Sequence, residues 1–309
     1  MSGAPPDKGA GYRSGYVALV GRPNAGKSTL VNALVGAKVA IVSATPQTTR
    51  NRIVGVRTEE RGQAVLFDLP GVHRPLHRMN ARMMNDVRSA LEEVDLVLHL
   101  VDASVDWGAG EAFLFELLEP VECPVVGVLT KADLLRPRAL LLPLIERYSE
   151  HRPSAEVVPV SVLAGEGLDE LLSVMFRLLP EGDPFFPDGV TTTQSEAFLI
   201  AETVREKLLE RTRDELPFTT GVVVDLLEES GERLHAEAVI YVERSGQKGI
   251  VIGRGARTLK AVGQAAREEL ERRLGVSMYL GLRVKVHPRW REDPRVLIAM
   301  EPGRIDLEG

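Results

Sequence analysis

The sequence has a single cysteine, Cys123, and no long run of apolar residues. One cysteine cannot close a disulfide within the chain, and because it precedes an apolar run we expect it to pack in the core. No stretch reaches the roughly 20 apolar residues that a membrane-spanning helix needs. Residues 1–14 are rich in glycine, proline and charge and lack the apolar centre of a signal peptide. We therefore expect a cytoplasmic protein with a flexible N-terminus over residues 1–14.

Length and the distribution of turn-forming residues predict two domains. The chain has 309 residues, of which 44% are hydrophobic, and this length exceeds that of a usual single core. A stretch rich in proline, glycine and threonine lies between two helical patterns. We expect a first domain over 15–183, a linker over 184–193 and a second domain over 194–309. Thr193-Gln194-Ser195-Glu196 fits a capping box, which predicts the start of the second domain's first helix.

A phosphate-binding loop follows the first apolar strand. Residues 21–28 read GRPNAGKS, which fits G-x-x-x-x-G-K-[ST], and they lie between a strand-like run and a helical run. The backbone amides of such a loop wrap phosphates, Lys27 can neutralise the β and γ groups, and Ser28 can ligate magnesium. The residues that we expect to bind a nucleotide here are Gly21, Asn24, Ala25, Gly26, Lys27, Ser28 and Thr29.

A second motif, Asp68-Leu69-Pro70-Gly71, fits D-x-x-G and ends another apolar run. It places a carboxylate near the magnesium and the Gly71 N–H near the γ-phosphate. The next residue is Val72, where many small GTPases carry a glutamine that orients the attacking water. Catalysis is therefore expected to rest on Lys27, Asp68 and Gly71, with slow unassisted turnover. His73 is a weaker candidate for a base, because phosphoryl transfer needs little proton abstraction.

Two further motifs indicate guanine recognition. Thr130-Lys131-Ala132-Asp133 is close to N-K-x-D, in which the Asp133 carboxylate accepts hydrogen bonds from two donors that adenine does not offer. Ser161-Val162-Leu163 is close to the S-A-x loop that backs the base. Each motif alone is weak, since an ordinary turn also ends a strand. Four in order, each at the carboxyl end of a strand, predict an α/β fold with a doubly wound P-loop GTPase domain. The helix expected after Thr193 and the strand-like runs over 221–227 and 235–242 predict a smaller α+β domain.

The second domain carries a basic block. Residues 244–291 contain twelve Lys or Arg and three Asp or Glu, a net charge of +9, which leaves −15 for the rest of a chain whose formal charge is −6. This contrast indicates a nucleic acid or an anionic surface as partner. A solvated helix face is the alternative, since acidic residues lie beside basic ones over 267–273. Arg254, Arg257 and Lys260 lack such neighbours and lie in and just after a glycine-bearing turn that can hold phosphates.

The segments GRPNAGKS, ATPQTTR, DLPGVH, TKAD, SVL and VERSGQKGIVIGRGARTLKAVGQAAR, in this order, resemble the bacterial Era GTPase family over nearly the whole chain. The resemblance implies a KH domain that binds the 3′ end of small-subunit ribosomal RNA and a role in assembly of the small ribosomal subunit. Some members of the family contact the membrane peripherally, and we expect a monomer. The resemblance implies RNA contacts by Lys248, Gly253, Arg254, Gly255, Ala256, Arg257 and Lys260.

The resemblance also bears on metal ions. The segment 47–50 resembles the family's first switch, which implies that Thr49 ligates magnesium together with Ser28 and Asp68 when GTP is bound. Asn24 and the missing glutamine after Gly71 suggest that a potassium ion supplies the charge of an arginine finger. Asn24 as a residue that merely tolerates the turn is the alternative.

Three positions depart from the family pattern. Thr130 stands where asparagine is usual, so the side-chain contact that braces the guanine site does not carry over. Val162 replaces the usual alanine but leaves the backbone amides of its loop available. Ala256 replaces the last glycine of the G-x-x-G turn, where a methyl group restricts a positive backbone angle and the close approach of a phosphate.

Two functional hypotheses stay open. The first is a slow GTP hydrolase whose nucleotide state controls RNA binding, and the intact Lys27, Ser28 and Asp68 favour it. The second is an RNA-binding assembly protein that uses GTP as a structural ligand. The chain lacks the second phosphate loop of tandem-domain GTPases and the C-terminal cysteine motif of a tRNA-modifying GTPase.

Overall fold

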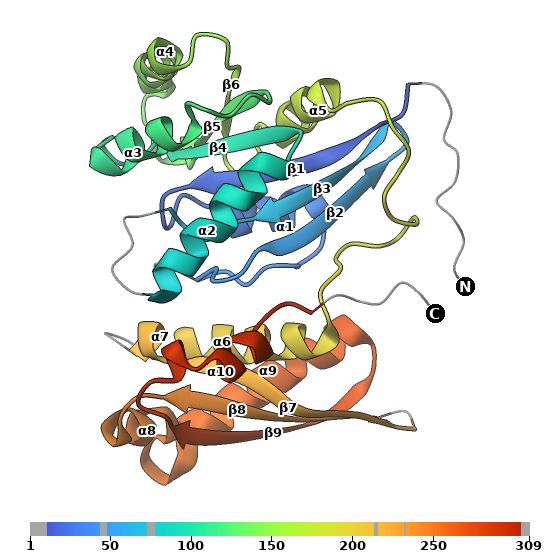
Figure 1. The fold of residues 1–309 in the computed structure, drawn as a ribbon, viewed down its shortest axis with the longest axis vertical. Coiled ribbons are helices and arrows are strands. Elements are labelled where there is room, and N and C mark those ends of the chain that lie inside the picture. Colours follow the sequence, from blue (N-terminus) through green and yellow to red (C-terminus); the bar gives the residue numbers. More distant parts are fainter. Residues whose placement is uncertain (1–10, 44–47, 73–77, 213–215, 232, 304–309) are drawn as a thin grey trace. The chain divides into compact units, whose positions relative to one another are not determined.

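The computed structural model describes residues 11–43, 48–72, 78–212, 216–231 and 233–303. The chain divides between Thr193 and Gln194 into two compact units, each with its own sheet and core (Figure 1). None of the described helices is long and apolar enough to cross a membrane.

The first unit is built on a six-stranded sheet with the order β2-β3-β1-β4-β5-β6. Only β2 runs antiparallel, to β3, and the other pairs are parallel. The strands are β1 Arg13–Gly21, β2 Ile53–Glu59, β3 Gly62–Asp68, β4 Leu96–Asp102, β5 Val125–Thr130 and β6 Val157–Val160. Strand β1 begins before residue 15, where the sequence predicts the start of the domain.

Helices cover both faces of this sheet because its strands are apolar on both sides (Figure 1). Along β1, Val17 and Leu19 face α1 and α5, whereas Ala18 and Val20 face α2 and α3. The helices are α1 Lys27–Val35, α2 Arg78–Glu93, α3 Ala109–Leu118, α4 Leu141–His151 and α5 Leu168–Leu178. Single 3₁₀ turns over Ala132–Leu134 and Arg138–Leu140 precede α4. The doubly wound α/β fold predicted from the sequence is confirmed.

The second unit is a three-stranded sheet, β7-β8-β9, with helices packed on it. Strands β7 and β8 are antiparallel, and β8 and β9 are parallel. Its core joins α6, α8 and α9 to the apolar side of β8, so the predicted α+β class is confirmed. The elements are α6 Glu196–Leu209, α7 Leu216–Thr219, β7 Gly221–Ser230, β8 Arg233–Val242, α8 Ser245–Ile252, α9 Arg257–Leu274, β9 Ser277–Val286 and α10 Pro294–Ala299.

The cap of α6 differs from the expected capping box. The N-cap residue is Ser195, not Thr193, and its Oγ accepts a hydrogen bond from the Phe198 N–H at 3.3 Å. The same hydroxyl donates to the Pro302 carbonyl oxygen at 2.9 Å. The expected cap is wrong because a partner 107 positions along the chain fixes Ser195, and no local pattern reveals such a partner.

The stretch expected to be a linker is held against the first unit. The fully buried Gln63 accepts hydrogen bonds from the Phe185 and Phe186 N–H groups at 2.7 and 2.9 Å. Further along, the Thr191 carbonyl oxygen accepts from the Val56 N–H at 2.8 Å. The Thr192 hydroxyl donates to the Val54 carbonyl oxygen at 2.7 Å. Residues 185–192 are thus bound to β2 and β3 at both of their ends.

Candidate functional site

The loop after β1 ends at the N-terminus of α1, as the sequence predicts. Gly26 is the N-cap with φ 90°, and no side chain caps the helix. The N–H groups of its first turn therefore remain available to an anion. Asn24 also adopts a positive φ of 65°, a conformation that asparagine tolerates better than most residues.

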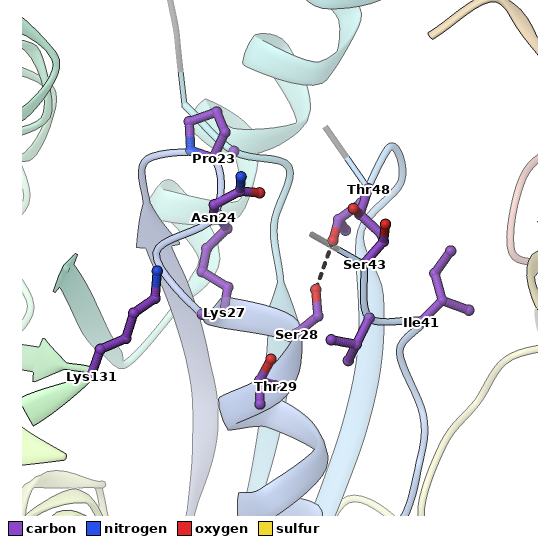
Figure 2. A pocket seen from close by; sticks show the side chains of 13 residues that line it. Pro23, Asn24, Lys27, Ser28, Thr29, Ile41, Ser43, Thr48 and Lys131 are labelled. Atoms are coloured by element: carbon purple, nitrogen blue, oxygen red, sulfur yellow. Dashed lines mark hydrogen bonds between the residues drawn. The ribbon is translucent and has the colours of Figure 1, made fainter. Parts of the chain in front are cut away.

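A cavity of about 360 Å³ opens above this helix end (Figure 2). It brings together the phosphate loop, the segment before β2, Gly71 and Lys131, which lie far apart in the sequence. The residues that line it are Pro23, Asn24, Gly26, Lys27, Ser28, Thr29, Ile41, Val42, Ser43, Thr48, Thr49, Gly71 and Lys131.

The Lys27 ammonium group is bound by backbone carbonyl oxygens of the phosphate loop. Its Nζ donates to the carbonyl oxygens of Gly21 and Arg22 at 3.1 and 3.0 Å. An ammonium group has three N–H donors, so one remains for a phosphate. Burial lowers the pKa of Lys27 to about 8, although the charges of Asp68 and Glu111 oppose this. The side chain therefore stays protonated at neutral pH.

Three oxygen-bearing side chains converge beside Lys27. The Ser28 hydroxyl donates to Asp68 Oδ2 at 2.6 Å, and the Thr49 hydroxyl donates to the same oxygen at 3.1 Å. The two hydroxyl oxygens are 2.9 Å apart. Asp68 is fully buried, and burial raises the pKa of its carboxyl while Lys27 and the two hydroxyls lower it.

This cluster fits a magnesium ion. Hydroxyl and carboxylate oxygens are the ligands that Mg²⁺ prefers. Asp68 Oδ1 is buried and has no hydrogen-bond partner among the described residues, so an acceptor is left for a cation. The three residues are those predicted from the sequence. Of the two threonines of the first switch, both line the cavity, and Thr49 joins the oxygen cluster.

Gly71 lies against the phosphate loop. A Cβ atom at this position would be 2.9 Å from the backbone of Pro23, so only glycine allows this approach. The Val72 N–H donates to the Gly21 carbonyl oxygen at 3.1 Å, and the Val72 side chain is buried in the core. Val72 therefore cannot position a water molecule. His73 and Gln47 lie outside the described residues.

Of the residues expected on the guanine side, Lys131 lines the cavity, and the others lie on adjoining loops. Parallel pairing of β5 with β6 brings the loops after Thr130 and Val160 to the same sheet edge. Ser161 is buried and accepts a hydrogen bond from the Ala164 N–H at 3.1 Å. Val162 packs on the core, and Leu163 is 91% exposed.

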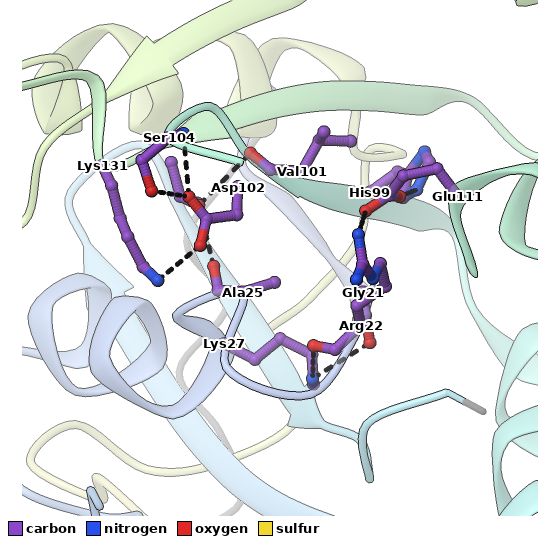
Figure 3. Close-up of polar contacts among 11 residues, drawn as sticks. Gly21, Arg22, Ala25, Lys27, His99, Val101, Asp102, Ser104, Glu111 and Lys131 are labelled. Carbon is purple, nitrogen blue, oxygen red and sulfur yellow. Dashed lines mark hydrogen bonds and ion pairs between the residues drawn. The ribbon is translucent and has the colours of Figure 1, made fainter. Parts of the chain in front are cut away.

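Thr130 makes a side-chain contact that could not be expected from the family pattern, in which this residue is asparagine. Its hydroxyl donates to the Ala25 carbonyl oxygen at 2.8 Å, so a threonine ties this strand end to the phosphate loop. Sequence reasoning missed Asp102, whose Oδ2 accepts from Lys131 Nζ at 2.5 Å (Figure 3). Hydrogen bonds from Lys131 and Ser104 outweigh burial and lower the pKa of Asp102. Asp102 lies directly after an apolar run, as Asp68 does, and this position is the feature of the sequence that could have identified it.

The turn in the second unit is strained at one residue. It follows α8 and contains Gly253, Gly255 and Ala256 with φ of 72°, 63° and 60°. A Cβ atom at Gly253 would lie 2.3 Å from the Thr258 hydroxyl. Ala256 adopts the left-handed conformation that its methyl group disfavours.

The basic residues of this turn are exposed. Arg254, Arg257 and Lys260 have no ion pair within the described ranges, and Lys248 is half-buried on α8. Further along α9, Glu269 pairs with Lys207 of α6 at 2.8 Å and interacts electrostatically with Arg273 of its own helix. The solvated helix face therefore remains a description of that part of α9, and the basic residues of the turn are the candidates for a ligand.

Two family models match the chain. One is described as a 50S ribosome-binding GTPase and matches residues 16–131, and the other is a KH domain and matches residues 222–291. Together with the loop geometry, they define a P-loop GTPase domain followed by a KH domain.

Two solved structures are similar over nearly the whole chain. Era in complex with MgGDPNP and nucleotides 1506–1542 of 16S ribosomal RNA is 37% identical, with 94% of this chain and 98% of that one covered and a TM-score of 0.90. A point variant of Aquifex aeolicus Era bound to GDP and AlF₄⁻ is also 37% identical, with 93% and 98% covered and a TM-score of 0.90. The chain belongs to the Era family of GTPases.

Ala256→Gly should stabilise the KH domain by about 0.5 to 1 kcal/mol, because the left-handed region costs an alanine roughly 1–2 kcal/mol and glycine loses part of this gain in backbone entropy. Ala256→Val should destabilise it, since a β-branched residue tolerates a positive φ least. Hydrogen exchange of the amides of α8 and α9 measures both changes. Equal protection in the valine variant and the parent would contradict the strained turn.

Proposed function

We propose that this chain is a magnesium-dependent GTPase that binds the 3′ end of small-subunit ribosomal RNA through its KH domain and acts in assembly of the small ribosomal subunit. The magnesium-dependent GTPase function is supported by one observation above all, the convergence of Ser28 and Thr49 on the buried Asp68 beside Lys27. The RNA part is supported by the solved Era structure with nucleotides 1506–1542 of 16S ribosomal RNA.

Hydrolysis of GTP rests on positioning and charge. The N–H groups at the start of α1 and the Lys27 ammonium hold the phosphates, and the Gly71 N–H is directed to the γ-phosphate. Ser28, Thr49 and Asp68 would hold Mg²⁺, which supplies charge neutralisation on the phosphate oxygens. Asp133 selects guanine by accepting hydrogen bonds from its edge, and Thr130, Lys131 and residues 161–163 complete that side of the site.

The alternative, GTP as a structural ligand, is less well supported. The hydrolytic residues are present and converge, and an Era variant has been crystallised with GDP and AlF₄⁻. A cytoplasmic location, a monomeric state and peripheral contact with the membrane are further proposals, and they rest on the family resemblance.

Single-turnover cleavage of GTP tests the enzyme function. Thr49→Ala should slow cleavage at least about tenfold, the usual cost of disturbing a metal site. Ser173→Ala, which removes an exposed hydroxyl on α5 outside the cavity, is the control and should stay close to the parent. The rate of phosphate release at saturating magnesium is the measurement. A parent chain that binds GTP without cleaving it would favour the structural-ligand alternative, and equal losses in the two variants would remove Thr49 from the metal site.

RNA binding should depend on Arg254 and Arg257. Each phosphate contact to a single strand contributes about 0.7 to the slope of log affinity against log salt, so the double variant Arg254→Glu, Arg257→Glu should lower that slope by roughly 1.4. Filter binding of a small-subunit rRNA 3′ fragment over a salt series measures it. Arg61→Glu, Arg177→Glu, which reverses two exposed charges of the GTPase domain, is the control. An unchanged slope in the first variant would contradict the assignment, and its GTP binding should be intact.

We further propose that potassium activates hydrolysis through Asn24, which lines the cavity. An amide oxygen and the backbone carbonyls of the first switch suit potassium better than the more tightly hydrated sodium. Hydrolysis should therefore be faster in potassium chloride than in sodium chloride at equal ionic strength, and Asn24→Ala should abolish the difference. Equal parent rates in both salts, or a potassium response that persists without Asn24, would leave Asn24 with only its role in the turn.

A further inference from the structure

A carboxylate that no nucleotide-binding motif contains lies buried behind the phosphate loop. Glu111 is in the first turn of α3, and its side chain is 3% exposed. A buried carboxylate is costly unless other groups compensate its charge. The Arg22 guanidinium does so, with Nη1 3.6 Å from Glu111 Oε1, whereas His99 Nε2 faces the other oxygen, Glu111 Oε2, at 3.7 Å (Figure 3).

Arg22 belongs to the phosphate loop, and its side chain lies across the start of α3. A Cβ atom at Gly110 would be 3.0 Å from Arg22 Nε and 3.1 Å from its Cδ. The glycine beside Glu111 thus makes room for the arginine stem. The same Arg22 provides, through its carbonyl oxygen, an acceptor for Lys27 Nζ at 3.0 Å and for the Ala25 N–H at 3.2 Å. The Arg22 backbone therefore fixes both the turn of the loop and the ammonium group of Lys27.

His99 lies beside the other carboxylate oxygen of Glu111, at 3.7 Å. It is fully buried on β4, and burial lowers its pKa while Glu111 opposes this. The Tyr148 hydroxyl lies 3.0 Å from His99 Nδ1, and burial raises the pKa of Tyr148, so this hydroxyl keeps its proton. When it donates to Nδ1, the proton of a neutral imidazole is on Nε2 and faces Glu111.

We propose that Glu111 is a positioning residue for the phosphate loop: its carboxylate, packed beside His99, anchors Arg22 and so keeps the Arg22 and Gly21 carbonyl oxygens where they orient Lys27 toward the nucleotide phosphates. The inference rests on the proposed GTPase function. It assigns roles to three residues, Arg22, His99 and Glu111, of which only Arg22 lies in a nucleotide-binding motif. Glu111 touches no phosphate and acts through Arg22.

Release of fluorescently labelled GDP from the full chain tests the proposal. Glu111→Gln keeps the shape of the side chain but loses its charge, and it should speed GDP release about tenfold, within the range of couplings between neighbouring residues. Arg22→Ala should speed release to a similar extent. In the double variant the two effects should not multiply, because both changes break the same link.

Controls separate positioning from general stability. Glu156→Gln breaks an ion pair with Arg177 of 2.6 Å in the same unit, and it should release GDP at the parent rate. The thermal midpoint is measured in parallel, because a merely structural role for Glu111 would lower the midpoint without changing the release rate of the folded protein. Arg22 is partly exposed, so its variant is expected to fold even where Glu111→Gln does not.

Three results would overturn the proposal: parent-like release in Glu111→Gln, parent-like release in Arg22→Ala, or effects that multiply in the double variant. A parent chain that does not bind GDP would instead contradict the proposed GTPase function, so the two failures are distinguishable.

Discussion

The nucleotide edge of the sheet depends on the mutual compensation of charges that have almost no access to water. Lys27, Asp68 and Glu111 are all buried, and burial alone would favour the neutral forms of Lys27 and Asp68. Lys27 is stabilised as a cation by the two carboxylates, and Asp68 is stabilised as an anion by Lys27 and two hydroxyls. The loop geometry, the oxygen cluster and the orientation of Lys27 therefore form one electrostatic unit, and none can be altered alone.

The sequence predicted those parts of the site that a short segment specifies. A glycine-rich loop between a strand and a helix, and carboxylates directly after apolar runs, are local patterns, and the structure brings Ser28, Thr49 and Asp68 together as expected. Contacts between distant elements were not predictable. Asp102 and Lys131 meet because β4 and β5 are neighbours, and Glu111 meets Arg22 because α3 begins beside the loop. Ser195 rather than Thr193 caps α6 for the same reason, since its second partner is Pro302.

Substitutions away from the family pattern keep the backbone geometry by different means. Thr130 replaces an amide with a hydroxyl, yet it still reaches the phosphate loop through the Ala25 carbonyl oxygen. Ala256 keeps the left-handed turn at a cost in local strain. At Thr130 the side-chain donor is thus a hydroxyl, and at Ala256 the turn keeps a positive φ without glycine.

The attachment of residues 185–192 to β2 and β3 changes what the connection between the two units can do. Eight residues of free chain would have a root-mean-square span of roughly 15 Å and act as a slack tether. Hydrogen bonds to Gln63, Val54 and Val56 instead hold residues 185–192 in place. The next element, α6, is capped at Ser195. The stretch that the sequence predicts as a linker is therefore folded onto the sheet of the first unit as far as Thr192 rather than acting as a free tether.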